Sequence, residues 1–212
     1  MAIDRERVVR TALQLLNEVG LERLTLRRIA TELDVQAPAL YWHFKNKKEL
    51  LDAMATTVLA DSAENPLEWE GMDWREFATT YGVGLRAALL RYRDGAKMVP
   101  GTYLTDDAMY RSMEASLQVL LDAGFGADDA SLALSTIYSY TVGFAIEEQA
   151  VYPRPGERDD RYDPARRRDR IDRELTPIVA ELAAQQHPPA EDHQFRRGLN
   201  VILAGLATML PS

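Results

Sequence analysis

An aromatic run followed by a basic cluster is the most distinctive chemical feature of this sequence. Residues 41–44 read Tyr-Trp-His-Phe, and lysines follow at positions 45, 47 and 48. Successive helical side chains are about 100° apart, so four in a row point around most of the helix and cannot all be buried. Exposed aromatic side chains with hydrogen-bonding tips can contact phosphates and thymine methyl groups, and lysines can contact phosphates. The run therefore indicates non-covalent binding to duplex DNA.

The residues around this run predict the elements that would position it. Thr25 is a good N-cap for a short helix, residues 34–37 interrupt that helix, and Pro38 suits the first turn of a second helix reaching Phe44. Asp34 falls in the turn, where an aspartate tolerates the left-handed conformation. Two short helices joined by a tight turn form the motif whose second helix enters the major groove. An earlier helix, capped by Asp4 and stopped by Gly20, completes a three-helix head.

Helical periodicity extends through the rest of the chain, and we find no alternation typical of strands. The fold class is predicted to be all-α, with a helix-turn-helix DNA-binding domain at residues 1–47 and a helical effector-binding and dimerisation domain at 48–212. Further helices are expected to follow the caps Asn46, Asp73, Thr105 and Asp163. Those starting at Thr105 and Asp163 are expected to reach Asp122 and Leu182, and two more are predicted over residues 128–151 and 192–210.

Composition excludes several classes of protein. The chain has 212 residues and no cysteine, which excludes disulfides, thiolate catalysis and zinc ribbons. Its net charge is -8, yet residues 1–50 carry nine basic and seven acidic side chains, so a basic head precedes an acidic body. The first seven residues do not have the basic patch and apolar run of a secretion signal, and no apolar run is long enough to cross a membrane, so we expect a cytoplasmic protein that does not contact membranes.

Several segments resemble the TetR family, and specifically its tetracycline-repressor branch. The resemblance spans nearly the whole chain and is most specific in the ungapped head. It rests on ALQLLNEVGL at 12–21, LT at 24–25, LYWHFKNKK at 40–48, LLDA at 50–53, RDGAK at 93–97, GT at 101–102, ALS at 133–135 and EEQ at 147–149.

This resemblance implies a ligand-responsive transcriptional repressor that leaves a palindromic operator when a small molecule binds. It also implies an all-helical homodimer in which a long fourth helix transmits ligand binding to the head. The dimer interface would be a four-helix bundle formed by residues 128–151 and 192–210 of two copies. The partners would thus be double-stranded operator DNA, a small-molecule effector and a second copy of the chain.

The same resemblance implies a set of DNA-contacting residues in the head. Tetracycline repressors have a glutamine and a threonine where this chain has Ala37 and Ala39, and alanine cannot supply the hydrogen bonds that read base edges. We therefore expect a different operator sequence. The implied DNA-contacting residues are Thr25, Arg27, Ala37, Pro38, Ala39, Tyr41, Trp42, His43 and Lys47.

The effector site departs further from that branch. Tetracycline repressors bind a magnesium chelate through a histidine that this chain replaces with Val99, which has no donor atom. An asparagine is replaced by Tyr81, and an arginine-proline pair by Tyr103 and Leu104. We therefore expect no metal, no cofactor and an apolar or aromatic effector other than magnesium-tetracycline, with Glu147 as a polar contact. The expected lining is Tyr81, Leu85, Val99, Thr102, Tyr103, Met113, Tyr138, Phe144 and Glu147.

Other interpretations remain open at this point. The aromatic helix could dock a protein, Tyr138 and Phe144 could belong to the core or a dimer interface, and residues 158–173 could be a second nucleic-acid patch. His187 and His193 could hold a metal, although histidines at such a junction are usually incidental. An enzyme is the main rival function, but the chain has no nucleophile elbow, phosphate loop or paired catalytic residues. A DNA-binding activator or scaffold without a ligand is a third alternative.

Overall fold

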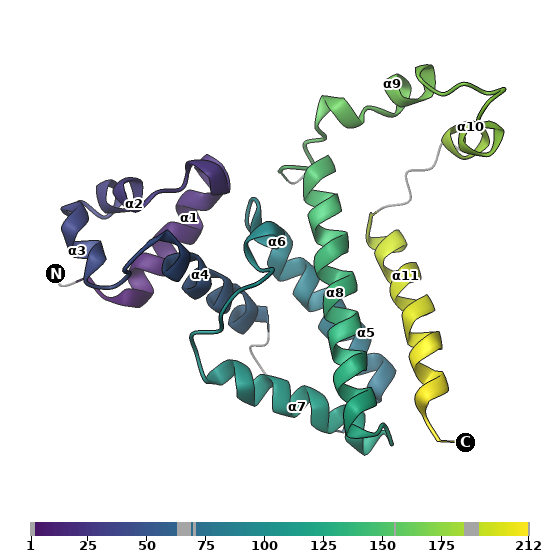
Figure 1. Ribbon diagram of the computed structural model, residues 1–212, viewed down its shortest axis with the longest axis horizontal. Coiled ribbons are helices and arrows are strands. Elements are labelled where there is room, and N and C mark those ends of the chain that lie inside the picture. Colours follow the sequence, from purple (N-terminus) through teal and green to yellow (C-terminus); the bar gives the residue numbers. More distant parts are fainter. Residues whose placement is uncertain (1–2, 63–68, 70, 155, 185–190, 212) are drawn as a thin grey trace.

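The computed structural model describes residues 3–62, 69, 71–154, 156–184 and 191–211. Regular structure within these ranges is helical, apart from one isolated bridge between Arg154 and Glu157, which confirms the expected fold class. The helices are arranged as a head, a body and a projecting arm (Figure 1). The elements are α1 (Arg5–Arg23), α2 (Leu26–Glu32), α3 (Ala37–Tyr41), α4 (Lys47–Ser62), α5 (Trp74–Leu90), α6 (Gly95–Met98), α7 (Ala108–Asp122), α8 (Ala127–Val151), η2 (Asp160–Tyr162), α9 (Pro164–Asp169), α10 (Pro177–Ala184), α11 (Glu191–Leu206) and η3 (Ala207–Met209).

Side-chain caps define where several of the helices begin. The Asp4 carboxylate accepts from the Arg7 amide at 2.7 Å, and the Thr25 hydroxyl accepts from the Arg28 amide at 3.2 Å. Asp73 likewise accepts from the Arg75 amide at 2.9 Å at the start of α5. Each bond satisfies an amide that has no partner within the helix. These caps were predicted from the sequence.

Predicted and observed helix bounds differ in several places. Helix α1 is assigned through to Arg23, although Gly20 has non-helical backbone angles of φ 75° and ψ 168°, so the regular helix breaks where it was expected to stop. The helix expected to follow Thr105 begins at Ala108. The helix expected from Asp163 to Leu182 is instead two short helices, α9 and α10, which form the arm. Helix α9 ends at Asp169. Beyond it the Asp172 carboxylate accepts from the Glu174 and Leu175 amides at 2.9 and 3.1 Å, which holds a turn there, and Pro177 then starts a new helix.

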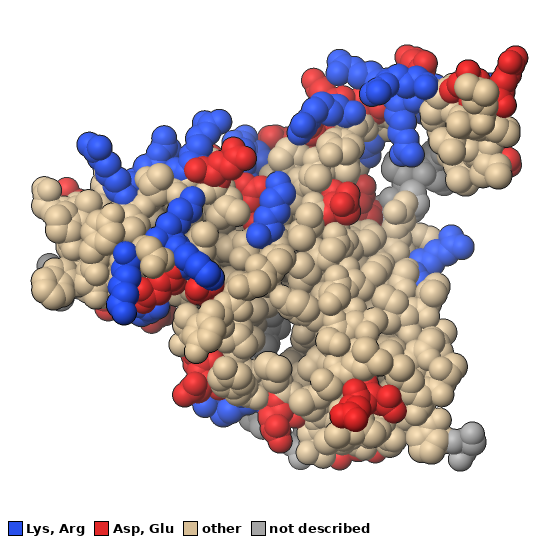
Figure 2. All heavy atoms as spheres, viewed as in Figure 1, with Lys and Arg blue, Asp and Glu red and all other residues tan. Residues whose placement is uncertain are grey.

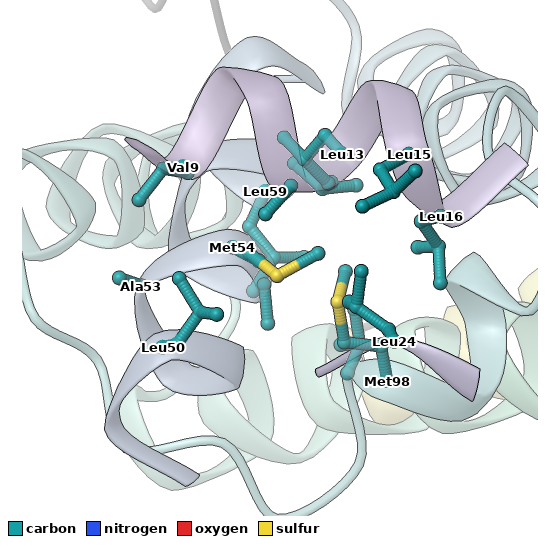
Figure 3. Close-up of a cluster of buried hydrophobic side chains, with 14 of the residues drawn as sticks. Val9, Leu13, Leu15, Leu16, Leu24, Leu50, Ala53, Met54, Leu59 and Met98 are labelled. Carbon is teal, nitrogen blue, oxygen red and sulfur yellow. The ribbon is translucent and has the colours of Figure 1, made fainter. Parts of the chain in front are cut away.

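One apolar cluster joins the head to the body through α4. Side chains of α1, including Val9 and Leu13, face Leu50 and Met54 of α4, and Met98 of α6 lies beside them (Figure 3). Burying a side chain of this size stabilises the fold by about 1.5–3 kcal/mol. Because head and body share this cluster, a displacement of α4 relative to α6 moves the head.

A second apolar cluster holds α5, α8 and α11 together. Phe195 of α11 is fully buried and stacks on Tyr140 of α8, with ring centroids 5.4 Å apart. The Tyr140 hydroxyl donates to the Phe195 carbonyl at 2.9 Å. Gly198 permits this contact, because a Cβ atom there would overlap the Tyr140 hydroxyl.

In the described part of the chain, no helix is both long enough and apolar enough to cross a membrane.

Replacing Gly198 with alanine is predicted to destabilise the body. The added methyl group would force Tyr140 away from α11, and overpacking of this kind costs about 1–3 kcal/mol. Urea denaturation followed by circular dichroism measures the change.

Gly205→Ala on the same helix is the matched control, because a Cβ atom there meets nothing within 4 Å. It should leave stability unchanged or raise it by up to about 1 kcal/mol through helix propensity. Equal losses in both variants would contradict the packing explanation.

Candidate nucleic-acid interface and ligand cavity

A tight left-handed turn sets the angle between α2 and α3. Asp34 has φ 55°, and the Val35 amide donates back to the Ala30 carbonyl at 2.9 Å. This bond closes the C-terminal end of α2 and satisfies a carbonyl that would otherwise lack a partner. The left-handed conformation expected of Asp34 is confirmed.

The large side chains at the end of α3 and just after it lie in two environments. Leu40 and Phe44 are fully buried beneath it, whereas Tyr41 and Trp42 are 56% and 90% exposed. The helix ends at Tyr41, so the expected continuation to Phe44 is wrong, but the prediction that these aromatics cannot all be buried is confirmed. Exposed aromatic side chains next to each other on a short helix are suited to contacting a DNA groove.

The N-terminal turn of α1 fixes the segment that follows α3. The Arg5 guanidinium lies 4.2 Å from the centroid of the Phe44 ring and donates to the His43 carbonyl at 2.6 Å. It also pairs with Glu49, whose carboxylate accepts from the Lys45 amide at 2.9 Å. These bonds, that of Lys45 first, hold the pKa of Glu49 below its usual value even though burial opposes this. His43 is half-buried in this arrangement.

The other predicted DNA-contacting residues lie on the same head. Thr25, Arg27 and Pro38 are exposed. Ala37 and Ala39 are half-buried. Lys and Arg side chains gather along the edge of the head over α1 and α2 (Figure 2).

Lys47 is partly engaged within the protein. Its ammonium group donates to the Leu21 carbonyl at 3.0 Å, which ties the start of α4 to the end of α1. An ammonium group has three donors, so this bond leaves others for a phosphate.

A mainly apolar cavity lies in the body, between α4, α5, α7 and α8 and beside the segment that follows α6. Its volume of 340 Å³ falls at the lower end of the range of about 300–1,000 Å³ typical of small-molecule sites. The described lining contains no charged side chain and no histidine. It consists of Leu59, Tyr81, Val99, Gly101, Thr102, Leu104, Met109, Met113, Leu117, Ser131, Leu134, Ser135 and Tyr138.

The structure brings five of the nine expected effector residues to this lining: Tyr81, Val99, Thr102, Met113 and Tyr138. None of them carries a charge. They come from three separate helices and the segment after α6, so only the fold brings them together.

The other four lie elsewhere. Leu85 is buried in the core, and Tyr103 is exposed, with its amide donating to the Asp52 carboxylate at 3.2 Å. Phe144 packs against Phe195, with ring centroids 5.3 Å apart, and Glu147 is exposed on α8. Helix α8 thus lines the cavity near Tyr138 but turns these later residues away from it.

Sequence reasoning missed one wall of the cavity on α7. Met109, Met113 and Leu117 recur at four-residue spacing and therefore lie on one helical face. Met113 was expected at the site, so this spacing could have identified its two neighbours.

The two tyrosines of the cavity are uncharged at neutral pH. Burial raises the pKa of Tyr81, and the neighbouring Tyr138 raises it further. Burial also raises the pKa of Tyr138. Both phenols therefore keep their protons.

The described lining of the cavity contains no histidine, aspartate or glutamate. Val99, which stands where the resemblance places a metal-ligating histidine, is buried and has no donor atom. Among the described residues, no three His, Asp or Glu side chains come together as a metal-binding cluster. His193 is exposed, and His187 lies outside the described residues.

Helix α6 links the cavity region to the head. Val99, at its end, lines the cavity, while Asp94, at its start, accepts from the Leu21 amide at 3.0 Å. The buried Gln149 amide holds this segment on both sides. It accepts from the Ala96 amide at 3.0 Å and donates to the Tyr92 carbonyl at 2.8 Å.

Asp94 is ionised at this junction. Burial opposes ionisation, but the bonds from the Leu21 amide and the Lys97 ammonium outweigh it and hold the pKa of Asp94 below its ordinary value. The carboxylate thus stabilises the junction at neutral pH, and this contribution is lost as pH falls through the lowered pKa.

A larger hollow of 590 Å³ opens beside the same junction. Charges of both signs line it, including Arg91, Arg93 and Glu191, and the Glu148 carboxylate in its wall is held by Arg86 at 2.7 Å. Its charged side chains suit a neutral ligand less well than the uncharged described lining of the smaller cavity, which is therefore the better candidate.

Two family profiles match the chain. Residues 8–54 match the profile described as "Bacterial regulatory proteins, tetR family", and residues 65–210 match "Tetracyclin repressor-like, C-terminal domain". Tetracycline repressor protein class C from Escherichia coli is 41% identical over 98% of this chain and 92% of its own length.

Solved structures are similar along the whole chain. A possible TetR family transcriptional regulator from Streptomyces coelicolor A3(2) superposes with a TM-score of 0.84 and 38% identity, covering 97% of this chain and 99% of its own. TetR from Acinetobacter baumannii AYE has a TM-score of 0.75 and 35% identity, covering 99% of this chain and 100% of its own.

Asp94→Ala is predicted to loosen the contact between head and body. The variant loses a charge-assisted acceptor for the Leu21 amide, a bond worth about 1.5–3 kcal/mol. Amide hydrogen exchange at Leu21 should accelerate, and the free energy of unfolding should fall.

Asp34→Ala is the matched control, since Asp34 and Asp94 have φ 55° and 58° and their replacement has a similar backbone cost. The control should not change exchange at Leu21. If the two variants accelerate that amide equally, the Asp94 side chain does not hold the junction.

Proposed function

This chain belongs to the TetR family of bacterial regulators, and we propose that it leaves a palindromic operator when a neutral aromatic effector fills the cavity. As a family member it is a ligand-responsive, DNA-binding transcriptional repressor and not an enzyme. The finer proposal is supported by one observation above others: the described lining of the ligand cavity carries no charge and includes Val99, which stands where the resemblance places a metal-ligating histidine.

The head, which we assign to residues 1–47, is the proposed operator-binding domain, and residues 48–212 form the effector-binding domain. The exposure of Tyr41 and Trp42 supports this division of function, as does the gathering of basic side chains along the edge of the head (Figure 2). Ala37 and Ala39 lack groups that read base edges, so the operator differs from those of tetracycline repressors. The proposed DNA contacts are Thr25, Arg27, Ala37, Pro38, Ala39, Tyr41, Trp42, His43 and Lys47.

A palindromic operator requires two heads, and we propose that α8 and α11 provide the homodimer interface. These helices pack side by side in the body (Figure 1) and expose apolar side chains such as Leu132 and Val201, which are 49% and 71% exposed. Burying such residues against a second copy removes apolar area from water. The dimer would act in the cytoplasm.

Release from DNA follows from linkage between the two sites. An effector that binds more tightly when α6 occupies one of two positions shifts α6 toward that position. Because Asp94 at the start of α6 is bonded to the Leu21 amide, the head moves with it. If that position separates the two heads from successive major grooves, about 34 Å apart, the effector weakens operator binding. Bound operator then weakens effector binding by the same factor.

Tyr41→Ala is predicted to lower operator affinity about 5- to 150-fold, because a groove contact is worth about 1–3 kcal/mol. Gel-shift titration on the DNA flanking the gene measures the change. Tyr110→Ala on α7 is a matched control, because both tyrosines are 56% exposed and only Tyr41 lies on the head. Equal affinity in the two variants would refute the assignment of α3 as the DNA-reading helix.

Magnesium should have no influence on effector response. We expect that tetracycline with magnesium does not release the operator, and that EDTA does not change release by the natural effector. Fluorescence anisotropy of labelled operator DNA measures both. Magnesium-dependent binding of tetracycline would show that the effector assignment is wrong.

A further inference from the structure

Two tyrosine hydroxyls of the ligand cavity have no hydrogen-bond partner in the described part of the chain. Tyr81 of α5 and Tyr138 of α8 both belong to the lining. Two other hydroxyls of the lining are engaged, since the Thr102 hydroxyl donates to the Met98 carbonyl at 3.4 Å and the Ser135 hydroxyl to the Leu132 carbonyl at 3.0 Å, while the remaining one, on Ser131, belongs to an exposed residue. Neither hydroxyl is among the fully buried unpaired side-chain atoms, so both can be reached from the cavity and are free to donate to a bound molecule.

Packing holds both phenols in place. The Tyr81 ring stacks on Phe77 with centroids 6.0 Å apart and lies between the two apolar clusters of the molecule. Tyr138 packs against the cluster that joins the head to the body. Fixed donors reduce the ordering cost of binding a ligand.

Both phenols line the same cavity and come from α5 and α8, two helices that pack together. Ionisation of Tyr81 is opposed by burial and by Tyr138, so the pKa of Tyr81 is raised and its phenol remains a donor. Tyr138 is likewise protonated because burial raises its pKa. Two neighbouring O–H groups can donate to one oxygen that has two lone pairs, such as a carbonyl oxygen.

The remaining walls restrict the rest of the ligand. Met109 and Met113 line one wall of the cavity, and methionine packs favourably against aromatic rings. The described lining offers no charged side chain to balance an ionised ligand, so a charged molecule would lose its hydration without compensation.

We propose that Tyr81 and Tyr138 act as a paired donor that selects effectors carrying a carbonyl oxygen on a neutral fused-ring aromatic skeleton, the class of aromatic ketones and quinones. This inference rests on the proposed function, because it assigns the chemistry of the same effector cavity. The Tyr140 hydroxyl, by contrast, already donates a hydrogen bond within the protein, to the Phe195 carbonyl. The uncommitted pair therefore determines specificity.

Fluorenone and fluorene provide a matched pair of probes, because they share a three-ring skeleton and differ by a carbonyl oxygen. Calorimetric titration of the full-length protein should give about tenfold tighter binding for fluorenone, the effect expected of two net hydrogen bonds. The Tyr81→Phe and Tyr138→Phe variants should each reduce this preference, and the double variant should abolish it. Fluorene affinity should change little, because the ring packing remains.

Tyr110→Phe, outside the cavity, is the control and should keep the full preference. Equal binding of the two probes by the unmodified protein, no binding of either, or a preference that survives in the double variant would each overturn the proposal. Gel-shift titration of the ligand-free double variant tests the repressor assignment separately, since operator binding should match that of the unmodified protein. Loss of probe preference with intact operator binding supports the paired donor.

Discussion

Burial of Leu40 and Phe44 beneath α3 is the constraint on which the rest of the structure depends. Both side chains are fully buried in the head, and Arg5 closes over the Phe44 ring. A helix of five residues has only a short apolar face, so anchoring that face directs Tyr41 and Trp42 outward. The exposed pair is therefore a consequence of core packing and not an isolated surface feature. The turn at Asp34 completes the arrangement by fixing how α3 leaves α2.

The anchored head is useful for regulation only because its position depends on the body. Helix α4 belongs to the core of the head and also faces the ligand cavity through Leu59. Helix α6 provides the second connection, with Val99 at the cavity and Asp94 bonded to the Leu21 amide. Through these two connections, a ligand bound in the cavity can change the orientation of α3. The buried Gln149 amide keeps the α6 connection stiff by bonding to the chain on both sides of Asp94.

Helix caps were predictable from the sequence because they depend on neighbouring residues. The directions in which side chains point were not, where packing between distant segments decides them. The caps at Asp4 and Thr25 depend on adjacent backbone amides, so residue types a few positions apart identify them. The arm was misjudged because an Arg-rich stretch has helical composition, yet Asp172 and Pro177 divide it. In the cavity, Leu104 lines the wall while the adjacent Tyr103 points to solvent. That difference depends on how an irregular segment packs between helices, which sequence periodicity does not encode.

Distance measurement between the two heads of a dimer tests the central claim most directly, namely that the body controls the spacing of two α3 helices. The chain has no cysteine, so a Gln36→Cys variant carries one nitroxide label immediately before α3. Electron-electron dipolar spectroscopy with operator DNA should give one defined distance, consistent with recognition helices about 34 Å apart. Addition of fluorenone should release the DNA and shift that distance. Absence of dipolar coupling, or a distance unchanged by a bound ligand, would contradict the account.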